Sequence, residues 1–357
     1  MLDKALRSLN AKEWMEALQY KIRQLEELRT WEVVNLPPSQ SAIPCSEVIR
    51  VKCGPDGEVQ SYRVRIVAGG HRQVEGINYN KTFSAAAKMP TVWVVLGNAA
   101  QQDWEIEHVD IKSAYLNVPL KKEIYMRAPR GILKPGQEGK VLRLLKGLYG
   151  LKQAGRGWYL EMLNIFIKKL RFKQSAIDHS VFYQRMAEEH TIVAVVTADM
   201  AVTWDITNHG PIKWFLGFEI RRNQEARTLS INQQAYIEAM VNKFGLTNMK
   251  RVSIPLDPHV QYSVKQCPSS LTQVARMKEV PYSKAIGSIL WPTVISHPDT
   301  AYAIGILSQF MQNPGPVHWE AAKWVISYLG STKDLWLTFG GKGGQQLEGY
   351  CNADWGS

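Results

Sequence analysis

Two acidic residues have the clearest potential for chemistry in this sequence. Asp110 lies near the end of a predicted strand in WEIEHVDIKSAYLN, and Asp199 separates two apolar runs in VAVVTADMAVTWD. The pattern predicts a hairpin whose strands are residues 192–196 and 201–204, with Asp199 at its tip. Carboxylate oxygens are the ligands that hard cations such as magnesium prefer. An acid at the end of a strand is equally compatible with an ordinary solvated position, so both interpretations stay open at this point.

Two arginines form a second group. In SYRVRIVAG, Tyr62, Val64 and Ile66 alternate with Arg63 and Arg65, so the two arginines are predicted to share one face of a strand. Guanidinium groups suit phosphate oxygens because they donate hydrogen bonds in a planar fork. A solvated strand face is the alternative interpretation.

The overall charge favours a polyanionic partner. The chain of 357 residues carries a formal net charge of +11, with 45% hydrophobic and 21% charged residues. This composition is that of a globular protein with room for more than one domain, and it excludes global disorder. An excess of positive charge fits nucleic acid first, although a merely basic surface would give the same number.

Membrane insertion and disulfide formation are not expected. No apolar stretch reaches the ~18 residues of a membrane span, and the start MLDKALRSLNAKEW lacks the apolar core of a signal peptide. Four cysteines at positions 45, 53, 267 and 351 are scattered without the spacing of metal ligands, which is typical of reduced thiols in an intracellular protein. No segment is an address signal that distinguishes cytoplasm from nucleus, and the oligomeric state is not readable.

Strands and helices must position these residues. Asn10 is predicted to begin a helix with a capping-box spacing to Glu13, and the apolar stripe of this helix runs from Trp14 to Leu28. Later helices are predicted at residues 158–171, 234–246, 283–296, 299–311 and 317–329. The segment FGGKGGQQ is predicted to be a flexible spacer. The order is therefore a mixed α/β region followed by a mostly helical one.

Several segments resemble the reverse transcriptases of copia-type retrotransposons. The matching segments are TWEVVNLP, YRVRIVAGGHRQVEGINYNKTFS, WEIEHVDIKSAYLN, IYMRAPRGI, LYGLKQAGRGW, DHSVF, WFLGFEI, PYSKAIGSILW and LEGYCNADW. They occur in the family's order and cover nearly the whole chain, so together they are far more specific than any one alone. The resemblance implies an α+β, right-hand polymerase fold. Fingers and palm would occupy residues 1–222, a thumb and a helical connection 223–339, and a truncated RNase H-like start 345–357.

The resemblance implies a role for the two acids. Such a polymerase joins a primer 3′-hydroxyl to the α-phosphate of a deoxynucleotide, and two magnesium ions about 4 Å apart clamp the attacking and leaving oxygens. The family supplies a strand-end aspartate, which matches Asp110, and a Tyr-Val-Asp-Asp hairpin tip. Ala198 and Asp199 match its two aspartates. Asp110 and Asp199 are therefore the catalytic and metal-binding candidates, and the first hairpin acid is missing. A shift of one residue along a strand turns a side chain to the opposite face, so Asp199 is a poor substitute.

Other positions match the family's nucleotide and primer contacts. Tyr115 matches the aromatic residue beneath the nucleotide sugar, Gln153 matches a residue that contacts nucleotide or template, and Arg63 and Arg65 match a triphosphate grip. The residues that match the primer grip, a β-turn pressing on the primer end, are Trp214, Phe215, Leu216 and Gly217. The alternatives are a buried tyrosine, a loop glutamine, a solvated strand face and simple apolar packing.

The sequence departs from the family at further places. Gly69 replaces a lysine of the phosphate grip, and Gly155 replaces a proline. Residues 205–212 contain glycine and proline and are too few for the helix that the family carries there, which predicts a shortened palm with uncovered sheet surface.

Two groups of residues in the C-terminal part carry no catalytic assignment. LEGYCNADWGS resembles the opening strand of an RNase H domain, but Asn352 replaces its leading acid. Asp354 alone cannot form a two-metal nuclease site, so no RNase H activity is expected. His297, His318 and Asp299 lie in the helical region and are interpreted as capping or surface residues rather than ligands.

Functions of different classes remain open at this point. The resemblance implies an RNA-directed DNA polymerase domain of a polyprotein, with an RNA template, a DNA primer and deoxynucleotides as partners and magnesium as cofactor. Ala198 predicts that this copy is catalytically impaired. The alternatives are a non-catalytic nucleic-acid-binding remnant, which would hold a duplex through phosphate contacts, and a decayed transposon relic.

Overall fold

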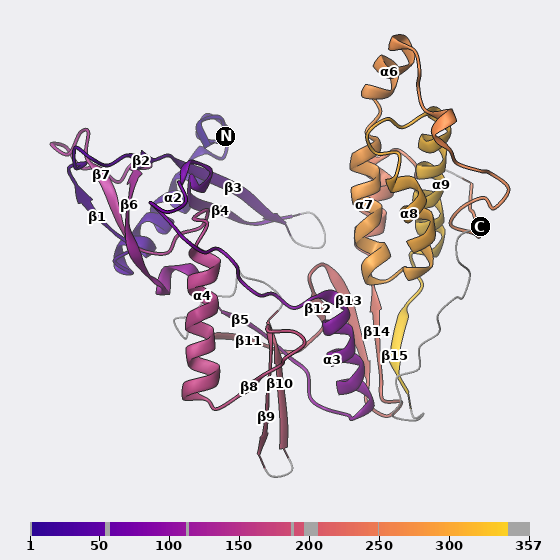
Figure 1. Ribbon diagram of the computed structural model, residues 1–357, viewed down its shortest axis with the longest axis horizontal. Helices are drawn as coiled ribbons and strands as arrows, with labels where there is room; N and C mark the ends of the chain where they lie inside the picture. Colours follow the sequence, from indigo (N-terminus) through magenta and orange to yellow (C-terminus); the bar gives the residue numbers. More distant parts are fainter. Residues whose placement is uncertain are drawn as a thin grey trace. The chain divides into compact units, whose positions relative to one another are not determined.

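The computed structural model describes residues 2–53, 58–111, 114–186, 189–195, 206–248 and 250–341. The chain forms two compact units (Figure 1). The first unit comprises Met1–Lys88 and Val109–His209, and the second comprises Met89–His108 and Gly210–Ser357. Both units are therefore assembled from segments that are separated in the sequence.

The first unit is mainly built from strands. Its elements are α1 (Leu2–Ala5), α2 (Ala11–Glu27), β1 (Trp31–Val34), β2 (Ala42–Ile43), β3 (Cys45–Cys53), β4 (Val59–Ala68), η1 (Gly70–Arg72), η2 (Ala114–Asn117), β6 (Pro119–Arg127), β7 (Val141–Lys146), α4 (Ala154–Leu163), the π-helical turn η3 (Asn164–Lys169), β8 (Lys173–Gln174), β9 (Val181–Met186) and β10 (Glu189–Ala194). They form a four-stranded sheet in the order β1-β7-β6-β2, a three-stranded sheet β10-β9-β8 and the antiparallel pair β3-β4.

Helix α2 covers one face of β4. Its apolar stripe buries Leu18, Ile22 and Leu25 in the same core as Val64 and Ile66. Side chains alternate between the two faces of a strand, so Arg63 and Arg65 lie on the face that α2 leaves open, and both are exposed. The alternation predicted from the sequence is confirmed.

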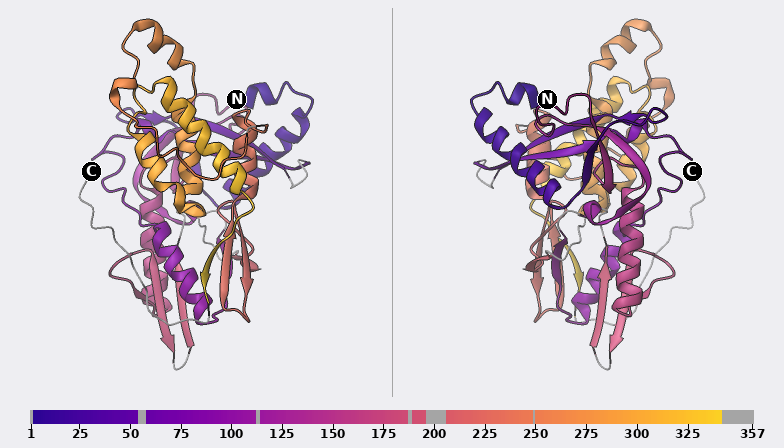
Figure 2. Two further views of the ribbon diagram at one scale, coloured as in Figure 1. Left: turned by 90° about the vertical axis from the view of Figure 1, so that its right-hand side faces the viewer. Right: turned by 90° about the vertical axis from the view of Figure 1, so that its left-hand side faces the viewer.

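The second unit combines one sheet with a group of helices. Its elements are α3 (Met89–Gln101), β12 (Trp214–Phe215), β13 (Phe218–Asn223), β14 (Thr228–Asn232), α5 (Gln234–Lys243), η4 (Val264–Gln266), α6 (Leu271–Lys278), α7 (Tyr282–Ile295), η5 (Pro298–Thr300), α8 (Ala301–Ser308), α9 (Pro316–Thr332) and β15 (Leu337–Gly340). Strands β12 to β15 pair in sequence order. Helix α3 packs on this sheet through Trp93, whose ring centroid lies 5.6 Å from those of Phe218 and Phe339. Helices α5, α7, α8 and α9 share a second core, and α7 to α9 lie side by side in orange and gold (Figure 2).

Strands β5 (Glu107–Ile111) and β11 (Ile206–Pro211) form a separate two-stranded sheet. The chain passes from one unit to the other within each of these strands. Residues 205–212 were predicted to contain no helix, and the described residues 206–211 form the strand β11 instead. Glycine and proline exclude a helix there, as predicted, but an edge strand tolerates both.

Most of the predicted helices are present. The helices expected at residues 234–246, 283–296, 299–311 and 317–329 correspond to α5, α7, η5 with α8, and α9. The mixed α/β class is confirmed. Among the helices of the described ranges, none is long and apolar enough to cross a membrane.

Other local expectations are wrong. Asn10 precedes α2, but its side chain makes no capping hydrogen bond, so the capping box with Glu13 does not form. Phe339 and Gly340, assigned to a flexible spacer, belong to β15. The helix expected at 158–171 begins earlier, at the start of α4, and continues as the π-helical η3. Helices α3 and α6 were not predicted. The β-branched residues of α3 favour strands in isolation, and packing on the sheet decides otherwise.

Two histidines are buried in the helical part of the second unit. His318 is fully buried, accepts a hydrogen bond from the backbone N–H of Gly315 at Nδ1 (2.8 Å), and stacks on Phe310 with ring centroids 3.9 Å apart. His297 is also buried, and its Nδ1 lies 2.9 Å from Oγ of Ser296. The capping interpretation holds for His318, whereas the surface interpretation is wrong for both. Burial lowers the pKa of each imidazole below the usual 6.5.

These lowered pKa values predict acid sensitivity. Each imidazole binds a proton less readily in the folded state than in the unfolded chain, so stability is lost as the pH falls through the unfolded pKa of about 6.5. The double variant His297→Gln, His318→Asn should lose less free energy of unfolding than the unaltered chain between about pH 7.5 and 5.5, as measured by chemical denaturation. His259→Asn, at an exposed position, is the matched control. Equal pH dependence in all three proteins would contradict the prediction.

Candidate functional site

Of the two acids predicted to bind metal, only Asp110 lies within the residues that the structure describes. Asp110 lies in β5, which pairs with β11. Ala198 and Asp199, and with them the predicted hairpin tip, lie outside the described residues. The described partner of β10 is β9, with Val193 opposite Phe182. Within the described ranges, no three His, Cys, Asp or Glu side chains form a group that could hold a metal ion.

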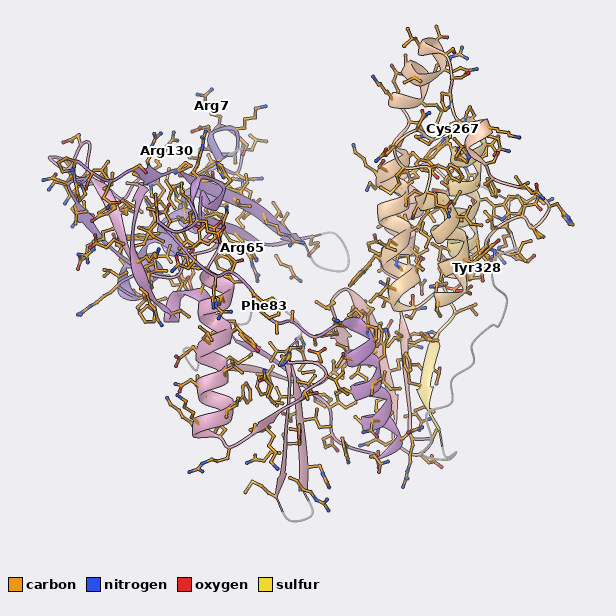
Figure 3. All side chains as sticks on the ribbon, viewed as in Figure 1. Arg7, Arg65, Phe83, Arg130, Cys267 and Tyr328 are labelled. Carbon is orange, nitrogen blue, oxygen red and sulfur yellow. The ribbon has the colours of Figure 1, made fainter. Side chains whose placement is uncertain are left out.

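An aromatic residue that the sequence analysis missed connects two of the predicted nucleotide contacts. Tyr115, in η2, is half-buried, and its ring meets that of Tyr149 edge-on at 5.0 Å. The guanidinium carbon of Arg65, a residue labelled in Figure 3, lies 5.8 Å from the centroid of the Tyr149 ring. The structure therefore brings Arg65 and Tyr115 to the same tyrosine. The position of Tyr149 in LYGLKQ, four residues before Gln153, was the available signal.

A second missed residue lies on the neighbouring strand. In the antiparallel pair β3-β4, Arg50 is directly opposite Arg63, and both are exposed. Like charges at directly opposite positions destabilise a strand pair. The pair therefore places two positive charges next to each other on the face of β4 that α2 leaves open.

Gln153 is held by hydrogen bonds within the first unit. It immediately precedes α4, its Oε1 accepts a hydrogen bond from Nε2 of Gln73 (3.1 Å), and its Nε2 donates to the carbonyl oxygen of Asn78 (3.1 Å). The residue is half-buried. Gln153 is therefore an oriented side chain and not a free loop glutamine, and Gln73 is a third residue that the sequence analysis missed.

Gly69 occupies a tight position. Its N–H donates to the carbonyl oxygen of Pro44 (2.7 Å), and a Cβ at Gly69 would lie 2.5 Å from Cγ of Pro44. A lysine here would therefore require Pro44 to move. The position at which the resemblance expects a lysine is therefore packed closely against Pro44. Gly155, the other departure, lies in the first turn of α4.

The residues matched to the primer grip lie in a β-hairpin of the second unit. Trp214 and Phe215 form β12, and Leu216 and Gly217 form the two-residue turn that follows it. Phe215 and Phe218 pair across it, and Leu216 and Gly217 have φ values of 45° and 87°. Positive φ at both central positions is the type I′ arrangement. Phe215 packs against Phe218, with centroids 5.6 Å apart, whereas Trp214 is 54% exposed. Apolar packing accounts for Phe215 but not for Trp214.

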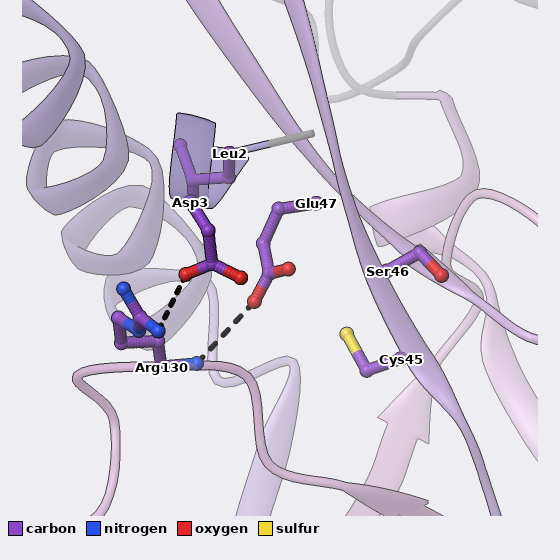
Figure 4. A pocket seen from close by; sticks show the side chains of 6 residues that line it. All are labelled: Leu2, Asp3, Cys45, Ser46, Glu47 and Arg130. Atoms are coloured by element: carbon purple, nitrogen blue, oxygen red, sulfur yellow. Dashed lines mark hydrogen bonds and ion pairs between the residues drawn. The ribbon is translucent and has the colours of Figure 1, made fainter. Parts of the chain in front are cut away.

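A cavity of about 380 Å³ lies elsewhere in the first unit (Figure 4). Asp3 pairs with Arg130 across it (2.6 Å), and Glu47 accepts a hydrogen bond from the backbone N–H of Arg130 (3.4 Å). Burial and the charge of Glu47 raise the pKa of the Cys45 thiol to about 12. A thiol with a raised pKa is mostly protonated at neutral pH, which makes it a weak nucleophile.

Comparison with known proteins identifies the family. The family model described as reverse transcriptase (RNA-dependent DNA polymerase) matches residues 28–206, which include Arg50, Arg63, Arg65, Tyr115 and Gln153. This chain belongs to that reverse transcriptase family, whose members generally use magnesium and act on nucleic acids.

The relatives are retrotransposon polyproteins. The chain is 35% identical over 358 residues to the retrovirus-related Pol polyprotein from transposon TNT 1-94 of Nicotiana tabacum. The aligned region covers 95% of this chain and 27% of the relative. The chain is 29% identical over 369 residues to the retrovirus-related Pol polyprotein from transposon RE1 of Arabidopsis thaliana, and this alignment covers 98% of the chain and 24% of the relative. The chain thus spans about a quarter of the length of these relatives and corresponds to the reverse transcriptase domain of a copia-type Pol polyprotein. No solved structure matches it.

The arginine pair predicts a salt-dependent interaction with nucleic acid. Replacing Arg50 and Arg63 with glutamine should lower the affinity for a template–primer duplex and reduce the slope of log affinity against log salt by about two, because each phosphate contact contributes about one. Filter binding at several salt concentrations measures both quantities. The double variant Arg7→Gln, Arg23→Gln removes two exposed arginines elsewhere and should leave the slope nearly unchanged. Equal slopes in both double variants would contradict a phosphate role for Arg50 and Arg63.

The turn at Leu216 predicts stored backbone strain. A leucine with positive φ costs about 1–2 kcal/mol relative to a residue that tolerates this region, and asparagine before glycine is preferred in type I′ turns. Leu216→Asn should therefore raise the free energy of unfolding by about 1 kcal/mol, as measured by chemical denaturation. Leu216→Ala, which removes the same side chain and keeps the strain, is the control. The idea fails if asparagine is no more stabilising than alanine.

Proposed function

We propose that this chain is a right-hand polymerase domain in which nucleotide addition is abolished or strongly reduced while template–primer binding persists. The observation that carries the proposal is Ala198, which stands directly before Asp199 where the family resemblance expects the first of two adjacent aspartates. In this proposal residues 1–222 are fingers and palm, 223–339 are thumb and helical connection, and 345–357 resemble the start of an RNase H-like domain, with Asn352 in place of its leading acid.

The donor set does not fit the metal chemistry of an active enzyme. Magnesium, when bound, neutralises charge on the attacking and leaving oxygens of phosphoryl transfer, and it requires oxygen ligands. Asp110 and Asp199 supply carboxylates, but the methyl group of Ala198 supplies none. Loss of a residue that merely orients a metal ligand typically costs about 10–100-fold in activity, and loss of a direct ligand should cost more.

Binding depends on different residues. The net charge of +11 is distributed over many side chains, and Arg50, Arg63 and Arg65 are exposed on one strand pair. Phosphate contacts of this kind are individually weak and collectively strong, so the substitution at residue 198 does not remove them. Tyr115 and Gln153 lie in the segment that matches the family, which supports a nucleotide site beside this surface.

Restoring the acid tests the proposal. Primer extension on a primed RNA template with deoxynucleotides and magnesium should be absent or slow for the unaltered chain, and Ala198→Asp should raise its rate by about 100-fold or more. Asp110→Asn in the Ala198→Asp background should remove the recovered activity, which shows that the recovery uses the family's site. Filter binding of the duplex by the unaltered chain is measured in parallel.

Each result has a defined meaning. Extension by the unaltered chain at a rate close to that of Ala198→Asp would overturn the proposed loss of catalysis. Salt-insensitive or absent duplex binding would overturn the proposed binding function and favour a relic without a biochemical role.

A further inference from the structure

A directional chain of hydrogen bonds joins the loop after β4 to the start of α4. The backbone N–H of Lys152 donates to Oε1 of Gln73 (2.8 Å), Nε2 of Gln73 donates to Oε1 of Gln153 (3.1 Å), and Nε2 of Gln153 donates to the carbonyl oxygen of Asn78 (3.1 Å). The chain begins at a backbone donor and ends at a backbone acceptor, and neither can reverse its role. Turning either amide over would place two donors or two acceptors together, so the network determines both amide orientations.

Gln73 is the buried member of this chain. It is 5% exposed, and its backbone N–H donates to the carbonyl oxygen of Gly70 (3.1 Å), which holds it at the end of η1. A buried amide that loses its partners is costly to leave unpaired, so Gln73 has one strongly preferred position. Gln153, by contrast, is half-buried. The hydrogen bond to Asn78 uses one of the two Nε2 hydrogens of Gln153, and Oε1 of Gln153 is turned toward Gln73.

The loop that carries Gln73 and Asn78 is held to its surroundings at further points. Nζ of Lys152 lies 3.2 Å from the hydroxyl of Tyr79 and 4.9 Å from the centroid of its ring. Nζ of Lys122 donates to Oδ1 of Asn80 (2.9 Å) and to the carbonyl oxygen of Gly76. The loop and the start of α4 are therefore one connected piece, in which a change at Gln73 reaches Gln153 directly.

We infer that Gln73 is a positioning residue that makes Gln153 present an N–H donor, and not its carbonyl oxygen, to an oxygen acceptor of the incoming nucleotide. This inference rests on the proposed nucleotide site. The phosphates and the sugar of a nucleotide are rich in such acceptors, and Lys152 places a positive charge on the same short segment. With Gln73 removed, the carbonyl oxygen of Asn78 still accepts from Nε2, but Oε1 loses its partner, so the Gln153 amide is held at one end only and its N–H donor is less firmly positioned.

A double-mutant cycle on nucleotide affinity tests this assignment. The protein is bound to a template–primer duplex whose primer ends in a dideoxynucleotide, and the affinity for the next deoxynucleotide is measured by its protection of the complex against a competitor trap. No chemistry is required, so a catalytically impaired chain can be used. Gln73→Met should weaken nucleotide affinity by about tenfold, the effect expected for one lost hydrogen bond. In a Gln153→Met background the same change should have less than about a twofold effect.

Controls separate positioning from general damage. Gln184→Met removes a glutamine in β9 that donates to the carbonyl oxygen of Leu170 (3.0 Å), and it should leave nucleotide affinity unchanged. If Gln73→Met does not fold, Gln73→Glu serves instead. Its carboxylate still accepts from Lys152 but cannot donate to Gln153, so it should weaken nucleotide binding at least as much.

The outcomes distinguish this inference from the proposed function. Independent, additive effects of the Gln73 and Gln153 substitutions, or an effect of Gln184→Met equal to that of Gln73→Met, would overturn the inference alone. Extension by the unaltered chain would overturn only the proposed loss of catalysis. If neither the unaltered chain nor Ala198→Asp binds nucleotide, the nucleotide site and this inference both fail.

Discussion

The close approach of two backbone segments at the end of β4 determines how the first unit is assembled. The N–H of Ala68 donates to the carbonyl oxygen of Tyr149 at 2.7 Å, and a side chain at Gly70 would overlap the carbonyl oxygen of Gly150. Gly150 has a φ of +90°, which residues with side chains rarely adopt. Glycine permits both the contact and the dihedral. The loop after β4 therefore lies directly against the segment that leads into α4.

The residues matched to nucleotide binding depend on this approach. It brings Arg65 close to Tyr149, which also contacts Tyr115, and it places Gln73 within hydrogen-bond distance of Gln153. These residues come from three separate segments of the chain. The chemistry proposed for each of them requires that the segments pack in this way.

Binding and catalysis place different demands on a polymerase of this kind. Affinity for a duplex arises from many positive charges, and an exposed arginine pair such as Arg50 and Arg63 is one contributor among several. Phosphoryl transfer depends on a small number of oxygen ligands at fixed positions, so a single substitution such as Ala198 for an acid acts on it alone. A chain of this family can therefore keep the surface for its partners after the catalytic ligand is gone, which is the physical basis of the proposed function.

The sequence by itself determined the family, the mixed α/β class, the helices with strong 3.6-residue periodicity, the exposed face of β4 and the absence of an acid at Ala198. These properties are local or depend on residue type, so they can be read without knowing what packs where. Only the tertiary structure decided that Gln73 orients Gln153, that Arg50 faces Arg63, that residues 206–211 form a strand and that His297 and His318 are buried. Each of these depends on which distant segments come together, and a hydrogen bond between side chains 80 positions apart leaves no periodic signal in the chain.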